Sequence, residues 1–214
     1  MFCIIDDGAM QYMSTIIGVC STNFCTLCAD SRRVTNSSGG VEIVDDSTQK
    51  IFKLNDRVLF GAMGLFASYE NFLDPFNVYL DKCVITVRMA CKAVIDHINR
   101  NMNSGCGYMF RNYFVGGKDN KGKFCIYEIH FDTKTKEVET TLRAPDPPSY
   151  NFSVSCGVPF SLQAQKQNLM DSIGNVVSSS KTHTEMLSGL RHIIDKIAED
   201  EITVGGEMQT VSVF

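Results

Sequence analysis

The sequence lacks tryptophan and contains only five prolines among its 214 residues, so it is not a proline-rich or low-complexity chain. It also lacks a cluster of lysine and arginine residues, and 20 basic against 24 acidic residues give a formal net charge of −4. Proteins that bind nucleic acid through counterion release need such a basic cluster. We therefore expect no nucleic-acid partner. A chain of this length and ordinary composition can bury a substantial apolar core.

Long hydrophobic runs are also missing. The apolar runs at residues 16–20 and 58–63 have the length of buried strands and are too short to cross a bilayer. Residues 1–13 lack the basic start and long apolar stretch of a secretory signal. The nine cysteines are odd in number and scattered, which fits reduced thiols better than a disulfide framework. These features predict a cytoplasmic protein without a membrane partner.

The pattern of apolar residues predicts blocks of strands that alternate with blocks of helices. The first two strands form a hairpin over residues 14–30 that turns at Ser21-Thr22-Asn23, and residues 36–40 form a loop between two short strands. Further strands are expected at residues 50–54, 57–63, 111–117, 124–131, 137–142, 152–156 and 208–214. A helix is expected from residue 65 to about 72, because Pro75 prevents its continuation. Further helices are expected at residues 84–98, 162–177 and 183–198.

This order predicts the α+β class. The connections between successive strands are too short for helical crossovers, so the sheets are expected to be mainly antiparallel, packed on each other, with helices outside. The chain has no internal repeat and no linker long enough to separate two domains.

Five short motifs occur in an order and spacing that resemble proteasome β subunits and the bacterial HslV peptidase. They are M-S-T-I-I-G-V from Met13, A-D-S-R from Ala29, Q-K-I-F from Gln49, G-A-M-G from Gly61 and V-G-G from Val204. The resemblance implies the four-layer αββα sandwich of the N-terminal-nucleophile hydrolases. It implies a hydrolase domain over residues 14–214, preceded by a propeptide or N-terminal extension at residues 1–13.

The resemblance also assigns roles to particular residues. Ser14 falls at the position of the nucleophile, where the family usually has a threonine as the first residue of the mature chain. The structural acid of the family falls on Asp30, with Arg32 in register after it. The active-site lysine falls on Lys50, and the glycine whose amide helps to form the oxyanion hole falls on Gly64.

Elementary chemistry explains why these residue types suit amide hydrolysis. An N-terminal hydroxyl residue carries its own general base, the α-amine, with an unperturbed pKa of about 8. A nearby Lys50 ammonium would favour deprotonation of the hydroxyl, and Asp30 would hold that lysine in place. The amide of Gly64 would stabilise the oxyanion, a contact worth about 3 kcal/mol in related chemistry. Because side chains alternate along a strand, only one of Ser14 and Thr15 can face Lys50, and the family spacing to the acid selects Ser14.

The sequence departs from the family at three supporting positions. A serine, an aspartate and a second serine of the family align with Cys156, Glu201 and Val204. In addition, residues 1–13 precede Ser14, and they must be removed before Ser14 has a free amine.

The resemblance implies peptide or protein substrates, no metal or organic cofactor, assembly into rings with identical or homologous subunits, and an ATPase regulator. Two other functions stay open. The chain could be a non-catalytic structural subunit of the same fold, or an amidase that acts on a small molecule.

Several residues have a simpler alternative interpretation. Ser14 could be an inert strand residue, and Asp30 and Lys50 could form a pair that serves packing alone. Gly64 and Gly205-Gly206 could be turns. Cys20, Cys25 and Cys28 have the opening spacing of an iron–sulfur site, although buried thiols fit them better. The remaining polar features, interpreted as surface, cap or turn residues, are His183, His192 and residues 119–122.

Overall fold

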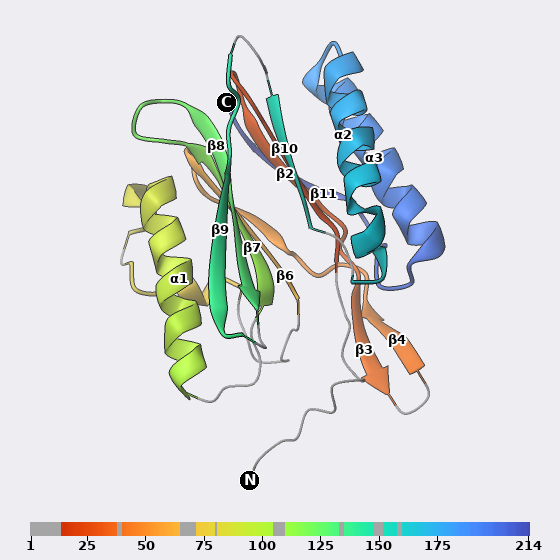
Figure 1. Ribbon diagram of the computed structural model, residues 1–214, viewed down its shortest axis with the longest axis horizontal. Helices are drawn as coiled ribbons and strands as arrows, with labels where there is room; N and C mark the ends of the chain where they lie inside the picture. The colour runs from red at the N-terminus through yellow and green to blue at the C-terminus, as the bar shows by residue number, and fades with distance from the viewer. Residues whose placement is uncertain are drawn as a thin grey trace.

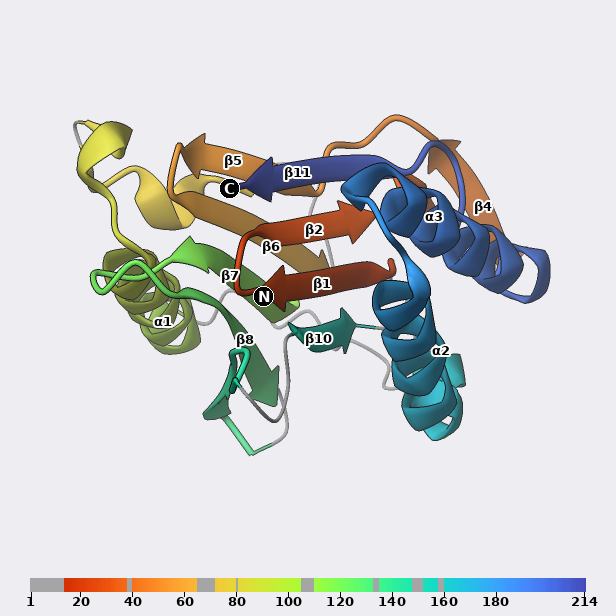
Figure 2. The same ribbon diagram turned by 90° about the horizontal axis from the view of Figure 1, so that it is seen from above.

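Two antiparallel sheets form the centre of the protein. The computed structural model describes residues 14–37, 40–64, 72–79, 81–104, 110–132, 135–147, 152–157 and 160–214 (Figure 1). One sheet has four strands in the order β10-β1-β2-β11, which lie side by side in Figure 2. These strands are β1 (Ile16–Ser21), β2 (Cys25–Ala29), β10 (Phe152–Gly157) and β11 (Gln209–Val213).

The second sheet has five strands in sequence order. They are β5 (Ile51–Asn55), β6 (Val58–Gly64), β7 (Phe110–Lys118), β8 (Phe124–Asp132) and β9 (Glu137–Arg143). A separate hairpin of β3 (Arg33–Ser37) and β4 (Gly40–Asp45) projects from the end of the four-stranded sheet (Figure 1).

Helices cover the outer face of each sheet. Helix α1 (Val87–Ser104) lies along the five-stranded sheet, and α2 (Lys166–Ser179) and α3 (His183–Asp200) lie along the four-stranded sheet (Figure 1). Thr182 caps the start of α3 because its side-chain oxygen accepts a hydrogen bond from the Glu185 amide. Three short 3-10 segments complete the described helices: Asp74–Phe76, Lys82–Val84 and Phe160–Gln165.

Three apolar clusters join these elements. Phe60 and Val94 belong to a cluster between the five-stranded sheet and α1. Leu27 and Phe114 belong to a cluster between the two sheets. A third cluster packs β1, β2 and β10 against α2 and α3. Gly18 lets the sheets approach closely, since a Cβ atom there would lie 2.8 Å from Cδ1 of Ile126.

The predicted mixture of helices with antiparallel sheets is confirmed, as is the first hairpin. Ser21 Oγ accepts hydrogen bonds from the amides of Asn23 and Phe24 and so closes the predicted turn. Two helix boundaries were wrong. Helix α1 continues through the mostly polar residues 99–104, and residues 160–165 form a 3-10 segment before α2 begins. Most of the helix expected from residue 65 lies outside the described residues.

Candidate active site

The candidate site lies where β1 begins and β2 ends. Ile16 pairs with Ala29 in the antiparallel register, so the residues that extend the two strands, Thr15 and Asp30, lie next to each other. The Asp30 amide donates to the Thr15 carbonyl at 3.3 Å, and the Thr15 amide donates to Oδ1 of Asp30 at 2.8 Å. Because the Thr15 amide is bonded directly to the Ser14 carbonyl carbon, Ser14 lies beside the Asp30 carboxylate.

The Asp30 carboxylate is fully buried and accepts four hydrogen bonds. Besides the Thr15 amide on Oδ1, the amides of Arg32 and Gly205 donate to Oδ2 at 3.1 Å and 3.3 Å. Lys50 Nζ donates to the same oxygen at 2.8 Å. Donors on both oxygens offset the loss of hydration of a buried carboxylate.

Lys50 is likewise buried, with 3% of its surface exposed. Its ammonium also donates to the Arg32 carbonyl at 2.5 Å. Burial raises the pKa of Asp30 and lowers the pKa of Lys50, and the attraction between the two opposes both shifts. Two of the three N–H donors of the ammonium are used, and within the described part of the chain the third has no partner.

Strand alternation assigns Ser14 and Thr15 to different faces. Ile16 points into the cluster between the sheets, and Ile17 points into the cluster under α2 and α3. Continued backwards, this alternation directs Ser14 toward the five-stranded sheet and Thr15 toward the helices. Lys50 directly precedes β5 of that sheet. Ser14 is partly exposed and Thr15 is fully buried. Ser14 is therefore the more accessible of the two hydroxyl residues.

Gly64 is the last residue of β6. The strand comes to the site because the Ala62 amide donates to the Lys50 carbonyl at 3.2 Å, two residues before Gly64. Gly64 has a φ of 138° and lies at an irregularity in the pairing of β6 with β7. Glycine is favoured at such a φ, so a backbone requirement alone explains the residue, and its role in an oxyanion hole stays a prediction.

The three supporting positions do not join the Asp30 and Lys50 pair through any hydrogen bond found among the described residues. Cys156 is buried in β10 opposite Ile17, and burial raises the pKa of its thiol to about 12. Val204 packs in the same apolar cluster as Cys156. Glu201 follows α3, and its Oε1 accepts from the amide and the hydroxyl of Thr203 at 3.2 Å and 2.8 Å.

Three contributors to this region were not predicted from the sequence. Asp46 binds the side chain of Arg32, and Gln209 accepts from the Lys50 amide at 3.0 Å while it donates to the Thr48 carbonyl at 2.9 Å. The third contributor is Thr203. It directly precedes Val204, and Val204 is the position at which the family has a serine. A hydroxyl residue next to that position is visible in the sequence, whereas nothing in the local sequence indicates Asp46 or Gln209.

The alternative interpretations of the cysteines, of residues 119–122 and of the two histidines can now be compared with the structure. Cys20, Cys25 and Cys28 are buried, and burial raises their thiol pKa values, to about 12 for Cys20 and Cys28. Across the described residues, no group of three or more His, Cys, Asp or Glu side chains could hold a metal ion. Residues 119–122 form the predicted turn, in which the Gly122 amide donates to the Asp119 carbonyl. His192 is on the surface, as predicted.

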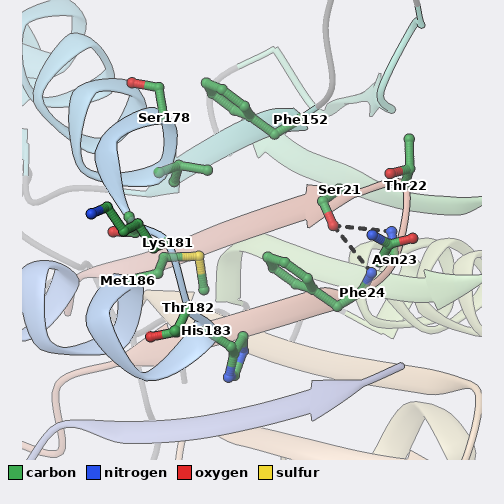
Figure 3. Close-up of a pocket in the computed structure, with 12 residues that line it drawn as sticks. Ser21, Thr22, Asn23, Phe24, Phe152, Ser178, Lys181, Thr182, His183 and Met186 are labelled. Carbon is green, nitrogen blue, oxygen red and sulfur yellow. Dashed lines mark hydrogen bonds between the residues drawn. The ribbon is translucent and has the colours of Figure 1, made fainter.

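His183 is partly buried, and it lines a pocket of about 640 Å³ (Figure 3). The pocket lies between the β1–β2 turn, Phe152 and the turn from α2 to α3, and Phe24 and Met186 supply apolar surface. Pockets of this size often bind ligands. None of the predicted site residues lines this one, since it lies at the opposite end of β2 from Asp30. The pocket is therefore separate from the buried ion pair of Asp30 and Lys50.

Comparison with protein families matches residues 10–141 to the proteasome subunit family. This match covers more than half of the chain and includes Ser14, Asp30, Lys50 and Gly64. The chain belongs to the proteasome subunit family, whose members assemble into rings with homologous subunits. Comparison with curated proteins finds no significant match.

No helix in the described part of the chain is both long and apolar enough to span a membrane.

Proposed function

We propose that the chain, after removal of residues 1–13, is a peptidase of the proteasome type with Ser14 as its N-terminal nucleophile. The buried pair of Asp30 and Lys50 beside Ser14 carries this proposal, because a buried ammonium held by a carboxylate is costly to maintain for packing alone. The proposal includes the four-layer αββα sandwich of N-terminal-nucleophile hydrolases, formed as one domain over residues 14–214.

The mechanism is acyl transfer. The Ser14 hydroxyl attacks the carbonyl carbon of the substrate amide, and its proton passes to the Ser14 α-amine. The Lys50 ammonium lowers the energy of the forming alkoxide by its charge, and Asp30 keeps that ammonium in place. The Gly64 amide donates to the oxyanion. The α-amine then gives its proton to the leaving nitrogen, and water hydrolyses the resulting ester to release the acid and restore Ser14.

We also propose a peptide or protein as substrate and identical or homologous ring subunits as partners. We further propose an ATPase regulator and a cytoplasmic location. The proposed mechanism requires no metal, so hydrolysis should resist chelators.

A second candidate is a non-catalytic structural subunit. The packing of Cys156 and Val204 in an apolar cluster favours it, because two positions that are serines in the family supply no hydroxyl here.

Hydrolysis of a fluorogenic peptide by two forms of the chain separates these candidates. We expect the form that begins at Ser14 to turn over the peptide and the form that retains residues 1–13 to be inactive, since only the first has a free amine at Ser14. The mass of each intact chain identifies its N-terminus before and after the assay. Equal turnover by a form confirmed to retain residues 1–13 would exclude the proposed mechanism.

A further inference from the structure

Arg32 and Asp46 form a two-point ion pair beside the candidate site. Arg32 Nε lies 2.7 Å from Asp46 Oδ1, and Nη2 lies 3.2 Å from Oδ2. The two side chains are 19% and 46% exposed, respectively. An ion pair this accessible to water contributes little to stability by itself. The other contacts of the Arg32 guanidinium are therefore more informative than the pair alone.

The same guanidinium contacts the segment that follows α3. Its Nη1 atom donates to the carbonyls of Ile202 and Val204, both at 3.3 Å. Gly205 packs against the guanidinium so closely that a Cβ atom there would lie 2.5 Å from Arg32 Cζ, and its φ of 153° also favours glycine. Arg32 thus joins Asp46 to residues 202–205.

Gly205, at the end of this segment, in turn contacts the buried carboxylate of Asp30. The Gly205 amide donates to Asp30 Oδ2, the oxygen that also binds Lys50. The Gly205 carbonyl accepts from the amides of Ser31 and Arg32 at 3.1 Å and 3.0 Å. Asp46 contributes a second connection, since its carbonyl accepts a hydrogen bond from the Ser31 hydroxyl. Displacing these residues would remove one of the four donors to Asp30.

We propose that Arg32 and Asp46 are positioning residues, which hold residues 202–205 against Asp30 and thereby fix this carboxylate relative to Lys50. This inference rests on the proposed function and adds two residues to its machinery. The planar fork of arginine is essential because it binds two carboxylate oxygens and two carbonyls at once. A lysine would keep the positive charge but could not span these four acceptors.

Two variants test the proposal, each with a control of the same substitution type. Arg32→Lys keeps the charge and removes the fork, and Asp46→Asn keeps the shape and removes the charge. Arg191→Lys and Asp96→Asn are the controls, because they alter the exposed pairs Arg191–Asp195 and Lys92–Asp96 on the outer helices. Every variant is made in the chain that begins at Ser14.

The first readout is hydrogen exchange of the backbone amides in residues 202–205, followed by mass spectrometry. We expect both Arg32→Lys and Asp46→Asn to accelerate exchange there, and we expect both controls to exchange like the wild type. The second readout is the titration of Lys50, followed by NMR of isotope-labelled lysine. In Arg32→Lys, the pKa of Lys50 should rise, because Asp30 loses a competing donor and water gains access to the ammonium.

A merely structural ion pair would leave the titration of Lys50 unchanged, and unchanged titration or unchanged exchange in Arg32→Lys would overturn the proposal. Both readouts are independent of catalysis. Where the wild type reacts with a β-lactone, Arg32→Lys should slow that reaction by up to about 100-fold, as expected for a displaced catalytic group. A wild type that does not react would contradict the proposed function, while exchange and titration would still decide the roles of Arg32 and Asp46.

Discussion

Lys50 Nζ lies 2.8 Å from Asp30 Oδ2, and the two side chains are only 4% and 0% exposed. This contact joins the end of the four-stranded sheet to the start of β5, next to Ser14. Burial disfavours both charges, so each depends on the other. The pair therefore supports the fold of this region as well as the proposed chemistry.

Removing Lys50 should destabilise the protein as well as inactivate it. Lys50→Ala leaves the Asp30 carboxylate buried without its counterion, and a loss of about 3–5 kcal/mol in the free energy of unfolding is expected. Urea denaturation measures this loss. Lys92→Ala is the control, because Lys92 forms an exposed pair with Asp96 and its loss should change little. Similar small effects for both variants would mean that the Asp30 and Lys50 pair contributes no more than a surface pair.

Two glycine substitutions should have opposite effects on stability. Gly205→Ala places a methyl group against Arg32 Cζ at an unfavourable φ, and a loss of about 1–3 kcal/mol is expected. Gly174 lies within α2 with no atom near the position of an added Cβ, so Gly174→Ala should gain about 1 kcal/mol through higher helix propensity. Thermal unfolding of both variants checks the signs. A neutral Gly205→Ala would show that residues 202–205 can move away from Arg32 freely.

His183 should make stability depend on pH. Its Nε2 atom lies 3.0 Å from Thr26 Oγ1, its ring contacts Phe24, and burial lowers its pKa below the usual value. The unfolded chain then binds the proton more tightly than the folded one. The stability due to His183 is complete above its unfolded pKa of about 6.5, and it is lost as pH falls through that value toward the folded pKa.

His183→Gln should therefore reduce the loss of stability between pH 7.5 and pH 5.5, as measured by urea denaturation at each pH. His192→Gln, on the exposed face of α3, is the control. If the two variants have the same pH dependence as the wild type, protonation of His183 is not linked to unfolding.

Thr15→Val should leave the stability of the protein unchanged or raise it. The Thr15 hydroxyl is buried, and it has no hydrogen-bond partner among the residues that the structure describes. Valine has nearly the same shape and removes this unpaired group, so the free energy of unfolding should stay equal or rise. Urea denaturation tests this, with Thr26→Val as the comparison, because the Thr26 hydroxyl contacts Ser212 and His183. A loss in Thr15→Val as large as in Thr26→Val would show that the Thr15 hydroxyl has a partner in solution.

The sequence predicted most strands because alternation and turn residues are local signals, as in the hairpin that turns at Ser21-Thr22-Asn23. It predicted helix ends less well. The mostly polar residues 99–104 suggest a loop, yet they continue α1, because a helix can extend beyond the last residue of its apolar stripe. The contact of Lys50 with Asp30 agrees with the family resemblance. The contacts of Arg32 with Ile202 and Val204 could not be predicted, because they join distant parts of the chain and follow only from how β11 pairs with β2.

The most direct test of the account is the intact mass of the chain that begins at Ser14 after incubation with a β-lactone. The Ser14 hydroxyl should open the lactone and add its whole mass as an ester, with Gly64 binding the oxyanion. We expect one adduct on the wild type, none on Ser14→Ala, and an adduct on Thr15→Val. Absence of an adduct on a wild-type chain confirmed to begin at Ser14 would contradict the proposed nucleophile.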